Sequence, residues 1–83
     1  MPKRLRITIK QLRSLKVISE LGSFSKAARF LNLTPPAITV QIRLLEESLG
    51  SKVLVRASDG RNFLTTVGQE IVELSMLIDN SIS

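Results

Sequence analysis

The chain has 83 residues, a formal net charge of +5 and three aromatic residues, all Phe, so its length suits one domain with one modest core. It contains neither Cys nor His, which excludes disulfide bonds and thiolate metal sites and removes the commonest general base and metal ligand. Seven carboxylates are scattered among basic residues, and we therefore expect no enzyme, no cofactor and no metal.

No apolar run approaches the roughly 18 residues that a bilayer-spanning helix needs. No apolar segment follows the basic residues near the N-terminus, as it would in a signal peptide. We therefore expect a cytoplasmic protein without a membrane partner.

The positive charge is concentrated in residues 1–66. This part contains all twelve Lys and Arg and four of the seven acids, for a net charge of +8, whereas residues 67–83 carry the other three acids and no base. A basic body with an acidic end suggests a polyanion such as nucleic acid as partner for the body. The alternative is a solvated basic surface that binds nothing.

The first helix is predicted after a flexible basic arm at residues 1–7. Thr8 and Gln11 fit a capping box, with Thr8 as the N-cap and Gln11 reaching back, and Gly22 fits the C-cap. The residues expected on the buried side of this helix are Leu12, Leu15 and Ile18.

Two further helices are predicted around a short break. Ser23 is placed to cap a short helix whose buried side is Ala27, Ala28 and Leu31, and small alanines allow another helix to approach closely. Asn32-Leu33-Thr34 is the break, since Asn tolerates the left-handed conformation that such a turn often needs. The next helix carries an apolar row at spacings of 4, 3 and 4, and Gly50 ends it; the row is Ile38, Ile42, Leu45 and Leu49.

A hairpin and a last helix complete the chain. The segment 53–56 is β-branched and strand-like, residues 57–62 contain the turn signal Asp59-Gly60, and residues 63–65 are the expected return strand. Thr65 or Thr66 then caps the last helix, with Thr66 and Gln69 as a candidate capping box. Its apolar row again has spacings of 4, 3 and 4, and consists of Val67, Ile71, Leu74 and Ile78.

The order of these elements predicts a mainly α fold, a winged helix-turn-helix of three helices and a two-stranded hairpin wing, followed by a long helix. In this architecture the second helix of the helix-turn-helix pair lies in the DNA major groove and its outward N-terminal residues reach base edges. Two alternatives remain open: a winged helix that contacts protein, and a DNA binder without sequence preference, which would show only a steep dependence on salt.

The chain resembles the DNA-binding part of LysR-type bacterial transcription regulators over residues 8–70. The segments that carry the resemblance are Leu12 to Leu15, GSFSKAA at 22–28, Leu31, PAIT at 36–39, Gln41-Ile42, Leu45-Glu46, Leu49-Gly50, Arg56, Leu64-Thr65 and Gly68. Within that family, the stretch TPPAITVQIRLLEE is most similar to regulators of carbon-dioxide-fixation operons.

The resemblance implies a division of the chain and a set of partners. Residues 8–65 would form the winged helix-turn-helix that binds double-stranded DNA, and residues 66–83 a linker helix that pairs two subunits. A C-terminal domain that senses a small-molecule effector is also implied. That domain is absent from these 83 residues, so we expect the chain to be part of a longer protein, for which a tetramer is one possible assembly.

The candidate base-facing residues are Thr34, Pro35, Pro36, Thr39 and Val40. A residue before proline is disfavoured in helical geometry, which leaves two possible N-caps, Thr34 and Pro35. Both give a rigid entry to the helix, although the Pro-Pro pair also fits a helix start with no further role. Val40 lies about 200° around the helix from Ile38, which favours exposure over a place in the core.

Two positions of this helix depart from the family. Relatives usually have Gln at the position of Pro35, and many have Arg at that of Val40. We therefore expect fewer hydrogen bonds to adenine and guanine, and more reliance on thymine methyl groups and DNA shape.

The candidate phosphate contacts lie outside this face, and are Ser23, Ser25, Lys26, Arg43 and Arg56. Backbone N–H groups at a helix start and nearby hydroxyls bind phosphate well, with Ser23 first of all a cap. The alternative for Arg43 is a solvated surface arginine without a phosphate partner. Residues 3–6 of the basic arm would add a salt-sensitive contact, or form only a solvated tail.

Arg61 and Asn62 are expected at the tip of the wing, with Arg61 as the candidate for the minor groove, whose negative potential favours Arg where it is narrow. The wing is one residue longer than the common family pattern, and Asp59 stands where relatives often have a basic residue. Entry of this wing into the minor groove is therefore left open.

The last helix is expected to form a dimer interface through Val67, Ile71, Leu74 and Ile78. Antiparallel pairing of two such helices gives a twofold homodimer, whose recognition helices would meet major grooves about one helical turn apart, or a multiple of it, on an imperfect palindrome. Packing onto its own domain alone is the alternative.

Overall fold

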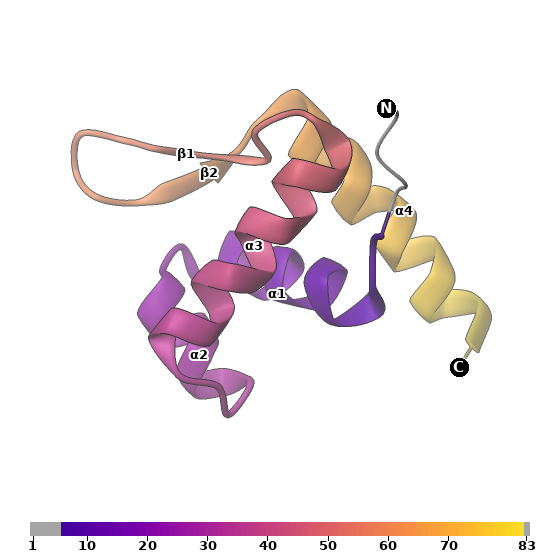
Figure 1. The fold of residues 1–83 in the computed structure, drawn as a ribbon, viewed down its shortest axis with the longest axis horizontal. Coiled ribbons are helices and arrows are strands. Elements are labelled where there is room, and N and C mark those ends of the chain that lie inside the picture. Colours follow the sequence, from indigo (N-terminus) through magenta and orange to yellow (C-terminus); the bar gives the residue numbers. More distant parts are fainter. Residues whose placement is uncertain (1–5, 83) are drawn as a thin grey trace.

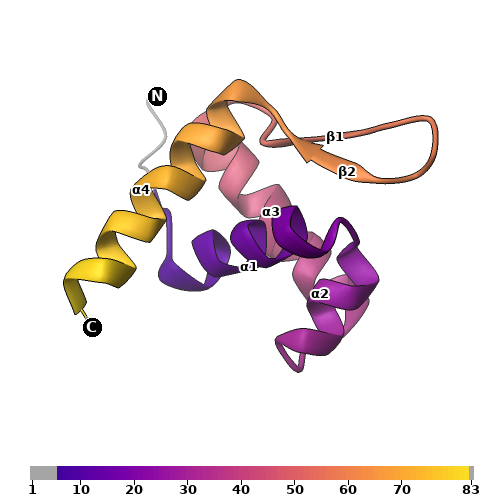
Figure 2. The same ribbon diagram turned by 180° about the vertical axis from the view of Figure 1, so that it is seen from behind.

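The computed structural model describes residues 6–82, and side chains as far as Leu77. Helices α1 (Ile9–Leu21), α2 (Phe24–Phe30) and α3 (Pro35–Leu49) are followed by strands β1 (Leu54–Arg56) and β2 (Asn62–Leu64) and by helix α4 (Thr66–Ile82). The antiparallel hairpin β1–β2 and the outer end of α4 project from opposite sides of the three-helix body (Figures 1 and 2). This arrangement confirms the predicted winged helix-turn-helix.

Local hydrogen bonds set the ends of the first helices. Thr8 Oγ1 accepts the Gln11 N–H at 3.1 Å and Gln11 Oε1 accepts the Thr8 N–H at 3.3 Å, so the predicted capping box is present. Ser23 Oγ accepts the Lys26 N–H at 3.2 Å and caps α2. Asn32 has a φ of 59°, which confirms the left-handed conformation expected for the break between α2 and α3.

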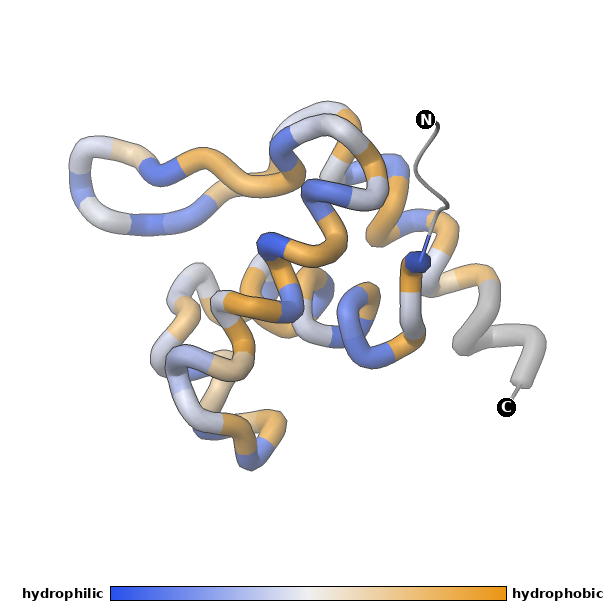
Figure 3. The backbone as a smooth tube through the Cα atoms, in the orientation of Figure 1, coloured by the Kyte–Doolittle hydropathy of each residue, from blue (hydrophilic) through white to orange (hydrophobic). Residues whose placement is uncertain are grey.

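The core lies where α1, α2 and α3 meet, and apolar residues recur along these helices (Figure 3). Its largest fully buried apolar side chains are Leu15, Ile18, Ile38, Leu45 and Val53. Ala27 and Ala28 are also buried, so α2 sits closely against the other two helices. Leu12, expected on the buried side of α1, is only partly buried at the edge of this core.

Val53 is part of the core and not of the wing, which corrects the predicted first strand. Its side chain is fully buried, and β1 begins only at Leu54. The wing therefore emerges directly from a core residue.

A set of hydrogen bonds around Val53, here called the joint, connects α3 to the wing and to α4. Glu46 Oε2 accepts the Val53 N–H at 2.9 Å, and Glu46 Oε1 lies 3.6 Å from Lys52 Nζ. The Val53 carbonyl accepts the Thr65 N–H at 3.0 Å, and Thr65 Oγ1 donates to the Lys52 carbonyl at 2.7 Å. The joint thus closes both ends of the hairpin onto the end of α3.

Thr65 is the cap of α4, since its hydroxyl oxygen accepts the Gly68 N–H at 3.0 Å. The candidate capping box of Thr66 and Gln69 was wrong, because α4 already includes Thr66 and the Gln69 N–H bonds to the Thr65 carbonyl. Thr65 also bonds to the Lys52 carbonyl, which favours it over Thr66 as the N-cap of α4. Sequence spacing does not reveal such a tertiary bond.

Helix α4 packs on its own domain through its first three turns. Val67, Ile71 and Val72 are partly buried against the core, and Ser75 is buried with its hydroxyl bonded to the Val72 carbonyl at 2.8 Å. None of the helices described here is long and apolar enough to cross a bilayer.

Gly68 is expected to resist substitution despite its place in a helix. A Cβ at this position would overlap the Val53 carbonyl oxygen and approach Leu64 Cδ2 to 3.1 Å. Gly68→Ala should therefore lower the free energy of unfolding by about 1–3 kcal/mol, as for other overpacked sites, although Ala normally stabilises a helix by about 1 kcal/mol relative to Gly. Urea unfolding followed by circular dichroism measures this difference. Gln69→Ala, at an exposed neighbour, is the control, and a midpoint for Gly68→Ala equal to that of the unchanged chain would contradict the close approach.

Candidate nucleic-acid interface

Helix α3 begins with a rigid turn. Thr34 is extended, with φ −78° and ψ 153°, and its Oγ1 accepts the Ala37 N–H at 3.2 Å, so Thr34 and not Pro35 is the N-cap. Pro35 and Pro36 occupy the first two helical positions, where a missing N–H costs no intrahelical bond. Proline before proline is therefore tolerated here, and the entry to α3 has little conformational freedom.

The N-terminal outward face of α3 is uncovered. Pro35, Pro36 and Thr39 are exposed, and Val40 keeps 37% of its surface, so it lies outside the buried row. The Thr39 hydroxyl donates to the Pro35 carbonyl at 3.1 Å. Its proton is thus used within the helix, and Thr39 offers a methyl group and an acceptor oxygen to a ligand. These four side chains therefore present no free hydrogen-bond donor.

Arg43 is exposed one turn further along the same helix, at the position predicted to contact a phosphate. Leu44 beside it also keeps 39% of its surface. The positive charge of Arg43 therefore lies beyond the exposed apolar face and not within it.

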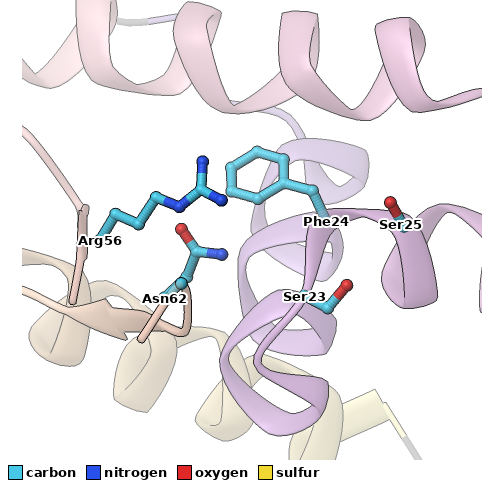
Figure 4. Close-up of a pocket in the computed structure, with 6 residues that line it drawn as sticks. Ser23, Phe24, Ser25, Arg56 and Asn62 are labelled. Atoms are coloured by element: carbon cyan, nitrogen blue, oxygen red, sulfur yellow. The ribbon is translucent and has the colours of Figure 1, made fainter. Parts of the chain in front are cut away.

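The wing and the start of α2 enclose a polar hollow of about 300 Å³ (Figure 4). Ser23, Phe24 and Ser25 line it from the α2 side, and Arg56, Gly60 and Asn62 from the wing. The side chains of Arg56 and Asn62 extend toward Phe24 (Figure 4). The fold thus brings together Ser23, Ser25, Arg56 and Asn62, which are far apart in the chain and were all predicted to contact DNA.

One backbone hydrogen bond links the two sides of this hollow. The Asn62 N–H donates to the Gly22 carbonyl at 3.4 Å and so fastens the wing to the turn between α1 and α2. Lys26, the other predicted phosphate contact on α2, is exposed next to the hollow but does not line it.

Asn62 does not lie at the tip of the wing, which corrects the sequence interpretation. It belongs to β2 and pairs with Arg56. The turn closes earlier than expected, because the Gly60 N–H bonds to the Ala57 carbonyl at 2.9 Å and the Ala57 N–H to the Arg61 carbonyl at 2.8 Å. The return strand therefore starts at residue 62.

Arg61 is at the tip, as predicted, but it is held by its neighbours. Its backbone N–H donates to Asp59 Oδ1 at 3.0 Å and its Nε to Asp59 Oδ2 at 2.8 Å. Its guanidinium carbon lies 5.1 Å from the centre of the Phe63 ring. Neither partner of Arg61 was predicted, although an Asp that accepts the backbone N–H two residues further along the chain is a common turn signal.

The predicted dimer residues fall into two groups. Val67 and Ile71 are partly buried against their own core, whereas Leu74 keeps 56% of its surface. The side chain of Ile78 lies outside the described part. Leu77, which was not in the predicted row, keeps 65% of its surface, and Met76 is also exposed.

The predicted basic arm is described only at its end. Residues 3 and 4 lie outside the described residues, Arg6 is exposed, and Ile7 packs against the core.

Comparisons with known proteins bear on this geometry. Residues 9–69 match the family described as bacterial regulatory helix-turn-helix proteins of the lysR family. The chain is 38% identical over 76 residues to the transcriptional regulator CbbR of Xanthobacter flavus. The matched segment covers 92% of this chain and 22% of that protein. It is 30% identical over 78 residues to the RuBisCO operon transcriptional regulator of Allochromatium vinosum, covering 94% of this chain and 26% of that protein.

Solved structures are similar over most of the chain. A mutant of OxyR from Corynebacterium glutamicum has a TM-score of 0.87 at 25% identity, over 96% of this chain and 26% of that one. The DNA-binding domain of CbnR in complex with DNA has a TM-score of 0.81 at 31% identity, over 90% of this chain and 85% of that one.

The chain spans about a quarter of the length of the curated relatives that it matches. The resemblance noted in the sequence, including its similarity to regulators of carbon-fixation operons, is confirmed by these matches. The chain belongs to the LysR family of bacterial regulatory helix-turn-helix proteins.

Proposed function

We propose that this chain is a sequence-dependent binder of double-stranded DNA, the DNA-binding part of a longer transcription regulator. The observation that carries the proposal is the uncovered N-terminal face of α3, where Pro35, Pro36, Thr39 and Val40 are exposed while the opposite face of the helix forms the core. A helix of this kind fits the major groove. The similar CbnR domain was solved in complex with DNA, which supports this assignment.

Base recognition by α3 rests mainly on apolar contact. Pro35, Pro36, Val40 and the Thr39 methyl group suit thymine methyls in the major groove. Because the Thr39 hydroxyl proton is already bonded to Pro35, direct hydrogen bonds to guanine make a small contribution. Sequence-dependent shape of the DNA supplies the remaining discrimination.

Phosphate contacts hold the helix in place. Ser25 and Lys26 on α2, Arg56 of the wing and Arg43 on α3 are exposed and carry donors or positive charge. Ser23 and Asn62 line the hollow beside Arg56 and add polar groups to it. Such contacts fix register and supply salt-dependent affinity without reading sequence.

Two copies of the chain pair through α4. The exposed apolar residues of this helix, Leu74, Met76 and Leu77, are the part of its surface left for a partner, since Val67 and Ile71 already cover the core. An antiparallel pair of α4 helices would relate two recognition helices by a twofold axis, and the DNA site would then be an imperfect palindrome.

The longer protein would be a cytoplasmic regulator with an effector-binding domain after α4. The relatives named CbbR and RuBisCO operon regulator suggest carbon-fixation genes as its targets. A tetramer of the whole protein is compatible with the dimer of this part.

The first test is fluorescence anisotropy with duplexes selected from a random library, each compared with its scrambled version at several salt concentrations. We expect a preference of about 10³-fold or more for a T-containing imperfect palindrome, the lower end of specific recognition. Equal affinities with a steep salt dependence would reduce the function to backbone binding. Absence of binding at low salt would reject DNA as the partner and favour a protein-contact module.

Val40 is expected to contact a thymine methyl. In the selected duplex, deoxyuridine in place of the thymine that faces Val40 should weaken binding about fourfold, since one buried methyl group is worth about 0.8 kcal/mol. The Val40→Ala variant should show a much smaller effect of the same base change. Thymines replaced outside the recognition site serve as the control, and equal losses for both proteins would contradict the contact.

The dimer is expected to depend on the outer half of α4. Leu74→Glu with Leu77→Glu should give a monomer in sedimentation experiments, because it places charge in the apolar pairing surface. The affinity for the palindrome should fall by about 100-fold or more as bivalent binding is lost, while that for a half-site is kept. Glu73→Gln on the same helix is the control. A variant that remains dimeric would place the interface elsewhere.

A further inference from the structure

The tip of the wing contains a closed group of three side chains that the proposed contacts do not explain. Both carboxylate oxygens of Asp59 are engaged by Arg61, at 3.0 Å by the backbone N–H and at 2.8 Å by Nε. The Arg61 guanidinium also lies against the face of Phe63. Arg61 is nevertheless 67% exposed and Asp59 53% exposed, so the pair is open to an incoming ligand.

The two arginines of the wing have different environments. Arg56 pairs with Asn62 across the hairpin and lines the hollow next to α2, whereas Phe63 pairs with Val55 at the neighbouring position. Since alternate residues of a strand face opposite sides, Arg61 over Phe63 lies on the other face of the hairpin. Arg56 is thus directed to the hollow, whereas the positive charge of Arg61 is paired with the carboxylate of Asp59.

Compensation changes what Arg61 can bind. A phosphate or base edge has to replace a charge-assisted hydrogen bond that already exists, and Asp59 brings a negative charge toward a polyanion. At a groove of ordinary width, replacing Asp59 by DNA as the partner of Arg61 therefore adds little binding free energy. A narrow minor groove, with its enhanced negative potential, attracts Arg more strongly and is the DNA feature best able to draw Arg61 away from Asp59.

We propose that Asp59 is a positioning residue that holds Arg61 back, so that Arg61 contacts DNA only where the minor groove beside the major-groove site is narrow. The proposal rests on the proposed DNA-binding function and assigns a determinant of specificity to it. Asp59 would make the wing a selective reader of DNA shape, since without it Arg61 would add affinity to any sequence.

The test compares the unchanged chain with Asp59→Asn, Arg61→Gln and the double variant. Asn at position 59 keeps an oxygen that can accept the Arg61 N–H, so the turn is preserved while the charge is removed. Each protein is titrated with two duplexes that share the selected site but carry A-tract or G·C-rich flanks under the wings. Glu20→Gln, on α1, is a control for the same change in net charge.

We expect Asp59→Asn to bind the duplex with G·C-rich flanks about fivefold more tightly, by converting Arg61 into an unconditional contact. Its plot of log affinity against log salt should be steeper by about 0.9 for each wing. Its preference for A-tract flanks should fall, and all three effects should disappear in the double variant.

The other outcomes distinguish failure of the wing proposal from failure of the proposed DNA-binding function. A gain that persists in the double variant, or that Glu20→Gln reproduces, would reject the role of Asp59 and leave only a general effect of charge. An unchanged flank preference in Asp59→Asn would reject the reading of shape. Absence of binding by every protein at low salt would reject the proposed function itself and the wing proposal with it.

Discussion

The bond from the Val53 N–H to the Glu46 carboxylate is the constraint on which the rest of the structure depends. It joins the last turn of α3 to the residue that enters the core and begins the wing. A hydrogen bond to a charged group contributes about 1.5–3 kcal/mol, more than a neutral one. Because the Val53 carbonyl also accepts the Thr65 N–H, one buried residue fixes where the wing leaves the domain and where it returns.

The same joint also connects α3, the proposed recognition helix, to α4, the proposed dimer helix. Thr65 caps α4, and Gly68 lets this helix pass so close to Val53 that a side chain would not fit. The direction of α4 is thereby set relative to α3. In a dimer paired through α4, this direction determines the distance between two recognition helices and hence which half-site spacing the DNA must have.

Features of the sequence that act locally could be predicted, and those that depend on tertiary contacts could not. The Thr8–Gln11 box and the Ser23 cap involve residues three apart, so spacing alone identified them. The burial of Val53, the choice of Thr65 as cap and the start of β2 at Asn62 follow from contacts with other segments. The apolar row of α4 was recognised by its helical spacing. Spacing alone does not tell which of its residues pack against the domain and which remain exposed.

The recognition surface and the wing follow one physical logic. On α3 prolines, a valine and a threonine whose hydroxyl proton is already bonded leave few donors for base edges. On the wing, the arginine at the tip is compensated by Asp59. In the proposed complex both features would lower nonspecific attraction to DNA, since phosphates bind free donors and free positive charge on any sequence. Discrimination would then depend on apolar fit to thymine and on groove width, properties of the DNA that vary with sequence while its charge does not.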